Sequence, residues 1–294
     1  MNIFCLCNRL LLMASTLIGG MAYASSPVRY SLVPVPGMTR AELVVVAHQN
    51  PAAVLVLAPG ANGDGEALVM DAGWRRFAEE QRLMLVGLSF ASEMDTIYDG
   101  TGYYYAAKGS GKLLLDAVDR LAGKRLPILL YGFSGGAHFT ARFAEWKPGR
   151  VAAWCAYSIG WGDDPQPSVA MPTGMVACGE EDGLLGFSLT YFKKGRAIGR
   201  PWLWVGIPKN THTQDSRVVF FAREYFAALL EGTQMSDEGR GGWVDVEEKA
   251  VAGENLSLYH PTSIGWLPDM RLFPKWVALM GEDTGDKTMG NHKK

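Results

Sequence analysis

One serine in the middle of the chain has the surroundings of a nucleophile. It belongs to Gly132-Phe133-Ser134-Gly135-Gly136, which follows an apolar run and precedes a helical pattern. Glycines on both sides of a serine permit a strand-to-helix turn that is too tight for larger residues, and such a turn exposes the hydroxyl. The helix after the turn would point its amino terminus at negative charge forming beside Ser134. The pattern predicts a serine that attacks a carbonyl carbon.

A serine hydroxyl is a weak nucleophile at neutral pH, so it needs a base, and the base needs an acid to orient it. Two later apolar runs end in suitable groups. One leads into the carboxylate cluster Gly179-Glu180-Glu181-Asp182-Gly183, and the other leads into Pro208-Lys209-Asn210-Thr211-His212. At strand-to-helix serines of this type the partners follow in the order acid, then histidine. We therefore predict Asp182 as the acid and His212 as the base.

Other side chains compete for these two roles. Glu180 and Glu181 flank the predicted acid, and Asp163 and Asp164 follow the preceding apolar run. Among the remaining histidines, His260 is the alternative base. The sequence favours Asp182 because the glycine three residues before it lets the chain turn ahead of the carboxylate.

Acyl transfer also requires hydrogen-bond donors for the oxyanion. The backbone NH of Gly135, directly after the serine, is one candidate. The second is the NH of Ala61, because Pro59-Gly60-Ala61 turns sharply after an apolar run and Gly60 allows a close approach of the backbone. Tyr103 and Tyr104, in a long loop, are candidates for contact with substrate or for packing beneath that loop.

The elements that must position these residues alternate between short β-rich runs and helical patterns, which favours a parallel sheet covered by helices. The predicted strands are Arg29–Val35, Leu43–Ala47, Ala53–Leu57, Met84–Ser89, Pro127–Tyr131, Val151–Tyr157, Gly174–Cys178 and Trp202–Ile207. The predicted helices are Gly65–Gln81, Ser110–Ala122, Gly135–Glu145, Leu184–Arg196 and Ser216–Leu230. A loop over Ala91–Lys108 interrupts the alternation. On the fourth of these helices, Phe187, Tyr191 and Phe192 favour core packing.

The two ends of the chain follow other patterns. Residues 1–24 are typical of a signal peptide, with Arg9, the apolar stretch Leu10–Ile18 and a cleavage site at Ala22-Tyr23-Ala24. We expect export to the periplasm or secretion, and no stable membrane insertion after cleavage. Residues 233–294 form a C-terminal extension whose tryptophans predict packing on the preceding domain, with a frayed end after Gly281.

Composition limits the classes of partner. The 294 residues are 48% hydrophobic with a formal net charge of −2, so the sequence gives no reason to expect nucleic-acid binding. Removal of the signal peptide would leave Cys155 and Cys178, either as a disulfide or as two buried thiols. Neither a metal nor an organic cofactor is required by serine chemistry, and the oligomeric state is not predicted.

These segments together resemble the α/β-hydrolase superfamily over roughly residues 28–232. Within it the chain is similar to exported esterases of the polyhydroxybutyrate depolymerase and feruloyl esterase type. The resemblance implies a mostly parallel central sheet of about eight strands, covered by helices on both faces, in a catalytic domain over residues 25–232. It also implies cleavage of a small-molecule or polymeric carboxylic ester. A serine peptidase or amidase with the same three residues, or a non-catalytic binding protein that retains the fold, is the alternative.

Overall fold

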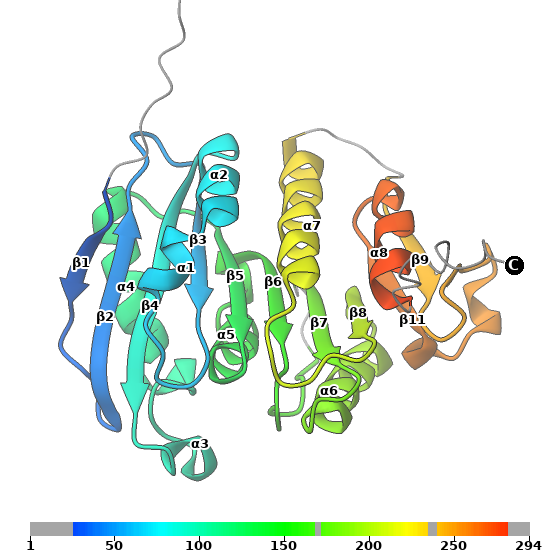
Figure 1. Cartoon of the computed structure of the whole chain (residues 1–294), viewed down its shortest axis with the longest axis horizontal. Helices are drawn as coiled ribbons and strands as arrows, with labels where there is room; N and C mark the ends of the chain where they lie inside the picture. The colour runs from blue at the N-terminus through cyan, green and yellow to red at the C-terminus, as the bar shows by residue number, and fades with distance from the viewer. Residues whose placement is uncertain (1–25, 168–171, 235–239, 282–294) are drawn as a thin grey trace, which may run out of the picture.

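The computed structural model describes residues 26–167, 172–234 and 240–281 (Figure 1). The predicted signal peptide and the last residues of the extension, 282–294, lie outside the described residues. An eight-stranded sheet in the order β1-β2-β4-β3-β5-β6-β7-β8 forms the centre of the fold. Its strands are β1 (Val28–Ser31), β2 (Met38–Val46), β3 (Ala53–Ala58), β4 (Leu83–Ser92), β5 (Ile128–Phe133), β6 (Val151–Tyr157), β7 (Thr173–Gly179) and β8 (Trp202–Ile207).

The sheet is mostly parallel, as the sequence predicted. β1 and β2 pair antiparallel, β2 joins β4 antiparallel, and every pair from β4 through β8 is parallel. The central strands β3 and β4 are buried along their whole length, because helices cover both faces of a parallel sheet. Parallel strands end on one edge, so the segments after β5, β7 and β8 meet there.

Helices lie on both faces of this sheet. α2 and α7 pack together on one face, whereas α5 and α6 line a common cavity on the other (Figure 1). The helices are α1 (Glu66–Met70), α2 (Ala72–Glu80), α3 (Thr96–Asp99), α4 (Ser110–Ala122), α5 (Gly135–Trp146), α6 (Leu185–Ala197), α7 (Ser216–Gln234) and α8 (Phe273–Met280). This confirms the predicted arrangement of a sheet between two helical layers.

One predicted helix, Gly65–Gln81, is two helices. The break lies at Asp71, whose backbone is extended (φ −59°, ψ 126°) and whose carboxylate accepts a hydrogen bond from the Trp74 NH at 2.8 Å. Aspartate is more favourable as an N-cap than in a helix interior, since its side chain competes for backbone NH groups. The apolar periodicity continued across the break and concealed it.

The first predicted strand is also shorter than expected. Pairing of β1 with β2 ends at Ser31, opposite Glu42, and the strand lies at the exposed edge of the sheet. The Leu32 NH still donates to the Ala41 carbonyl at 2.8 Å, and Pro34, which lacks a backbone NH, prevents the ladder from continuing to Val35 as predicted.

The C-terminal extension folds beside β8. A three-stranded sheet, β10-β9-β11, is made of β9 (Gly242–Asp245), β10 (Ala250–Val251) and β11 (Ile264–Leu267). The Trp276 indole of α8 donates to the Trp204 carbonyl of β8 at 2.9 Å, and Arg196 of α6 donates to the Ile264 carbonyl at 2.7 Å. The Arg196 guanidinium also lies 4.3 Å from the centre of the Trp243 ring. Tryptophans therefore anchor the extension to the main sheet.

Both cysteines of the described residues are buried free thiols. Cys155 of β6 is in register with Met175 of β7, so Cys178 lies three residues further along the neighbouring strand. That offset is about 10 Å at the rise of a β-strand. A disulfide needs its Cα atoms within about 7 Å.

Candidate active site

The three residues chosen from the sequence meet at the carboxyl edge of the sheet. Ser134 follows β5, Asp182 follows β7 and His212 follows β8. His212 Nε2 lies 2.9 Å from Ser134 Oγ, and His212 Nδ1 lies 2.9 Å from one carboxylate oxygen of Asp182 and 3.1 Å from the other. Ser134 and Asp182 lie 78 and 30 positions before His212 in the sequence, yet the three side chains form one hydrogen-bonded series.

The backbone at Ser134 is strained. Its φ of 52° and ψ of −115° are unusual for a residue with a side chain, and its NH donates to the Tyr157 carbonyl of β6 at 2.9 Å. Two flanking glycines make the turn possible. A Cβ on Gly132 would lie 2.2 Å from the Gly136 carbonyl oxygen, and a Cβ on Gly136 would lie 2.2 Å from the Ala58 carbonyl oxygen. The spacing of the motif therefore follows from close backbone packing.

Asp182 is held as a buried anion. Its side chain is 1% exposed, whereas that of His212 is 42% exposed. Burial alone would raise the pKa of Asp182, but hydrogen bonds from Ser158, from the Leu184 NH and from His212 outweigh burial and hold the pKa below its ordinary value. The carboxylate can therefore orient the imidazole and stabilise its positive charge.

Ser158 is a site residue that the sequence reasoning missed. It directly follows β6, is fully buried and has a φ of 56°. Its signal was weak, because serine after a strand is common. One feature could have identified it. The serine directly follows a predicted core strand, and that strand lies between the strand before the nucleophile and the strand before the acid.

The alternative acids and base lie elsewhere. Glu180 and Glu181 are exposed. Asp163 pairs with Arg142 at 3.0 Å, and Asp164 pairs with Lys194. His260 Nδ1 contacts the Thr262 hydroxyl at 2.7 Å in a short turn of the extension. The structure brings none of these five to Ser134.

The two amides predicted for the oxyanion adjoin each other. A Cβ built on Gly135 would lie 2.8 Å from the nitrogen and 2.7 Å from the Cα of Ala61, so the two backbones are in close contact. Within the described ranges, neither amide donates a hydrogen bond to a protein group. Gly135 also begins the twelve-residue helix α5, whose positive end faces the site.

Side chains fix the turn that carries Ala61. The Arg40 guanidinium donates to the carbonyls of Asn62 and Gly63 at 2.8 and 2.6 Å. The Asn62 NH donates to the Tyr103 hydroxyl at 3.3 Å. Tyr103 is 3% exposed and Tyr104 is fully buried, so both rings pack beneath the loop. The Tyr103 hydroxyl thus supports the turn, and contact of either tyrosine with substrate stays a prediction.

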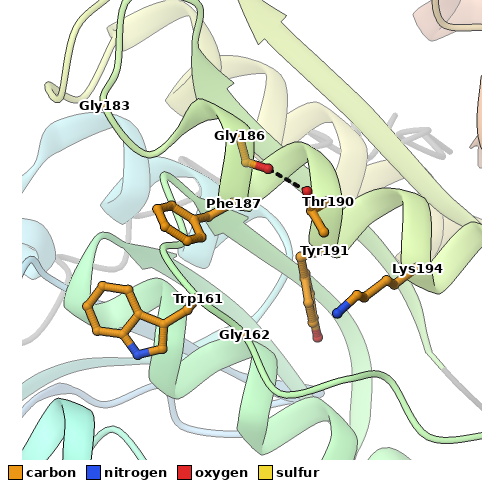
Figure 2. A pocket seen from close by; sticks show the side chains of 8 residues that line it. All are labelled: Trp161, Gly162, Gly183, Gly186, Phe187, Thr190, Tyr191 and Lys194. Atoms are coloured by element: carbon orange, nitrogen blue, oxygen red, sulfur yellow. Dashed lines mark hydrogen bonds between the residues drawn. The ribbon is translucent and has the colours of Figure 1, made fainter.

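A pocket of about 450 Å³ has Gly183, the residue after Asp182, in its wall (Figure 2). We call it the aromatic pocket, and it is lined by Trp161, Gly162, Gly183, Gly186, Phe187, Thr190, Tyr191 and Lys194. Tyr191 and Phe192 are buried as expected from the helical pattern, but Phe187 is 49% exposed and faces the pocket, so the expectation of core packing was wrong for this residue. Helical periodicity could not distinguish a pocket wall from the core.

Within the part of the chain that the structure describes, no three His, Cys, Asp or Glu side chains gather as metal ligands would. Among the described helices, none combines the length and apolar character needed to cross a bilayer.

No family model and no curated protein matches the sequence. Several solved structures do match. An S-formylglutathione hydrolase from Agrobacterium tumefaciens has a TM-score of 0.52 at 14% identity, over 69% of this chain and 94% of that chain. A hyperthermophilic esterase from the archaeon Pyrobaculum calidifontis has a TM-score of 0.51 at 13% identity, over 71% of this chain and 87% of that chain.

A third structure carries a different activity in its name. Dipeptidyl peptidase 4 from Porphyromonas gingivalis has a TM-score of 0.51 at 10% identity, over 71% of this chain but only 35% of that chain. At such identities the likeness is one of fold. Together with the strand order and the strand-to-helix serine, it shows that this chain has the α/β-hydrolase fold.

Proposed function

We propose that this protein is a serine hydrolase that cleaves a carboxylic ester through an acyl-enzyme intermediate. The observation that carries the proposal is the hydrogen-bonded series from Ser134 through His212 to Asp182, with bonds of 2.9 Å on both sides of the imidazole. A series in which a base contacts both a hydroxyl and a buried carboxylate is what activation of serine requires.

In the first half of the proposed reaction, Ser134 Oγ attacks the ester carbonyl and His212 Nε2 takes the hydroxyl proton. The carbonyl oxygen becomes an oxyanion that accepts hydrogen bonds from the NH groups of Gly135 and Ala61. Collapse of the tetrahedral intermediate breaks the bond to the alcohol oxygen, and His212 returns its proton to that leaving group. Asp182 stays ionised throughout, consistent with its lowered pKa.

In the second half, a water molecule takes the place of the alcohol. His212 removes one of its protons as the water oxygen attacks the acyl-enzyme carbonyl, and the same two amides bind the second oxyanion. Breakdown releases the carboxylic acid and restores the Ser134 hydroxyl. The exposed edge of His212, 42% accessible, gives water a route to the base.

The bond type rests on the resemblance and on the names of two fold neighbours, one of them an esterase. A peptidase or amidase would use the same groups, and a peptidase also shares the fold. The intact series argues against a binding protein that merely retains the fold, since binding requires no aligned base and acid. The narrower likeness to polyhydroxybutyrate depolymerases and feruloyl esterases stays a prediction.

The proposal includes export. The features of residues 1–24 support cleavage of a signal peptide and delivery to the periplasm or the medium. Expression of the full chain with mass determination of the mature amino terminus tests it. A mature protein that begins near Ser25 is expected, and an uncleaved chain retained in the cytoplasm would contradict it.

A direct test of the chemistry is covalent labelling by a fluorophosphonate, followed by hydrolysis of p-nitrophenyl esters of increasing acyl length. We expect labelling at Ser134 and turnover of at least one ester, both abolished in Ser134→Ala and strongly reduced in His212→Ala. Labelling with turnover of peptide or amide substrates alone would replace the ester proposal by the amidase. Absence of labelling in a folded protein would refute the nucleophile.

A further inference from the structure

Three aromatic rings converge beside the candidate active site. Tyr98 of α3 stacks on Trp161 with ring centres 4.8 Å apart and planes 15° apart. Phe187 of α6 meets Trp161 edge-on, at 6.2 Å and 78°. Tyr98 and Phe187 are nonetheless 74% and 49% exposed. Large apolar rings left in water next to a pocket favour a bound apolar group.

Glycines keep this aromatic pocket open (Figure 2). A Cβ on Gly183 or on Gly186 would meet no atom within 4 Å, so side chains there would project into empty space. Gly162 differs, because a Cβ on it would lie 2.7 Å from the Tyr191 ring. Gly162 therefore allows the floor of the pocket to close on Tyr191, while the other two leave its mouth unobstructed.

The pocket adjoins chain segments that carry the hydrogen-bonded series. Gly183 directly follows Asp182, whose carboxylate accepts a hydrogen bond from the Leu184 NH at 2.8 Å. On the other side, the Trp161 ring lies 5.3 Å from that of His138, one turn along α5 from Ser134. A group seated against Trp161 is thus adjacent to the elements that carry the nucleophile and the acid.

The polar side chains in the pocket wall already have partners within the protein. The Thr190 hydroxyl donates to the Gly186 carbonyl at 2.7 Å, and Lys194, at the far end, is paired with Asp164. Lys194 lies seven residues after Phe187, about 10 Å along the helix. A cavity of roughly 150 Å³ holds a benzene ring, so a pocket of about 450 Å³ takes a ring together with a short linker.

We infer that the aromatic pocket binds a flat aromatic ring carried by the ester substrate, on its acyl or its alcohol side, through aromatic contacts with Trp161 and Phe187. The inference rests on the proposed function for the reaction itself. An aromatic ring is preferred over a saturated ring of the same size because ring quadrupoles favour offset and edge-to-face contacts.

Matched pairs of esters separate the two sides of the substrate. For the acyl side, kcat/KM for methyl 3-phenylpropanoate is compared with that for methyl 3-cyclohexylpropanoate. For the alcohol side, benzyl acetate is compared with cyclohexylmethyl acetate. We expect a preference for the aromatic member of roughly 3- to 10-fold in one pair. Equal rates within both pairs would overturn the inference.

Variants locate the preference in the pocket. Phe187→Leu and Trp161→Leu should bring the aromatic-to-saturated ratio close to one. Gly186→Leu should lower kcat/KM for ring-bearing esters at least tenfold relative to ethyl acetate, because its side chain fills the space that the ring needs. Phe220→Leu is the matched control, since Phe220 of α7 is 50% exposed and lies outside the pocket. Ratios in the three pocket variants equal to the Phe220→Leu ratio would refute the site.

A binding measurement makes the result independent of turnover. Isothermal titration calorimetry of Ser134→Ala with 2-naphthylacetate and with 2-naphthylmethanol should show that at least one of them binds. Adding Gly186→Leu to Ser134→Ala should weaken the affinity for that compound at least tenfold. If a compound binds and Gly186→Leu weakens its binding, but the wild-type protein hydrolyses no ester, the proposed reaction is refuted and the pocket is supported. Failure of both probes to bind, in a protein that hydrolyses esters, would overturn only the pocket.

Discussion

The side-chain amide of Asn62 pairs with the backbone of Ser92 through two hydrogen bonds. Asn62 Nδ2 donates to the Ser92 carbonyl at 2.8 Å, and the Ser92 NH donates to Asn62 Oδ1 at 2.9 Å. Asn62 has a φ of 57°, a conformation that asparagine tolerates better than most residues. The turn that presents the Ala61 NH is thereby attached to the end of β4, a central strand of the sheet.

Loss of this attachment should impair the oxyanion site without disturbing substrate binding. We predict that Asn62→Gly lowers kcat about tenfold and changes KM less than twofold, because misplacement of a donor affects the transition state most. Glycine tolerates the positive φ, so backbone strain is not introduced. Steady-state kinetics of Asn62→Gly measure the effect, and Asn50→Gly is the control, because Asn50 precedes β3 and lies at the opposite end of that strand from Ala61. An unchanged kcat would show that the pairing does not position the amide.

The strain at Ser134 predicts an unusual order of stabilities. The free energy of unfolding of Ser134→Gly should exceed that of Ser134→Ala by about 1 kcal/mol, because glycine alone is relaxed at a φ of 52°. Ser134→Gly should therefore also unfold at the higher temperature. Thermal denaturation of both variants tests this. At Ser216, in the first turn of α7, alanine should be more stable than glycine. The same order at both positions would argue against strain at the nucleophile.

The assignment of Asp182 as the acid can be tested against the neighbouring carboxylates Glu180 and Glu181. We predict that Asp182→Asn lowers kcat by roughly 10³-fold or more, because the imidazole loses both its orientation and the negative charge that stabilises its protonated form. Glu181→Gln changes an exposed neighbour and should leave kcat within about twofold. Ester hydrolysis at saturating substrate measures both variants. If Glu181→Gln or Glu180→Gln were the more damaging change, Asp182 would not be the acid.

His138 should make the protein sensitive to acid. Burial, with a smaller effect from the Arg142 guanidinium, lowers the pKa of His138 to about 3, from an ordinary value near 6.5. The folded state therefore binds fewer protons than the unfolded state between these two values. Stability contributed by neutral His138 is complete above pH 6.5 and declines as the pH falls toward 3.

Denaturant unfolding at pH 7 and pH 4 measures this decline. We expect the wild type to lose about 2–3 kcal/mol more than His138→Gln over that interval, after allowance for a constant cost of the substitution. Other groups near the ring are Arg142 and its partner Asp163, which are retained in both proteins. Equal losses in the two proteins would show that folding does not lower the pKa of His138.

Local chemistry let the sequence predict the framework of the site. Gly132 and Gly136 could be recognised because only glycine fits where backbones approach within 2.2 Å of a Cβ position. Asp182 and His212 could be proposed because the ends of parallel strands share one edge, so order along the chain limits the choices. The β-rich runs were long enough to place all eight strands of the main sheet, with errors confined to ends such as Ser31.

Contacts between distant segments were decided by tertiary structure alone. Nothing near Ser158 in sequence indicates that its hydroxyl faces Asp182, and the same apolar periodicity places Phe192 in the core but Phe187 in a pocket wall. Exposure of a side chain depends on which other element covers it, and that element can lie anywhere in the chain. The sequence determined which groups could react and on which edge they lie, whereas the packing of β6, α3 and α6 around that edge determined what surrounds them.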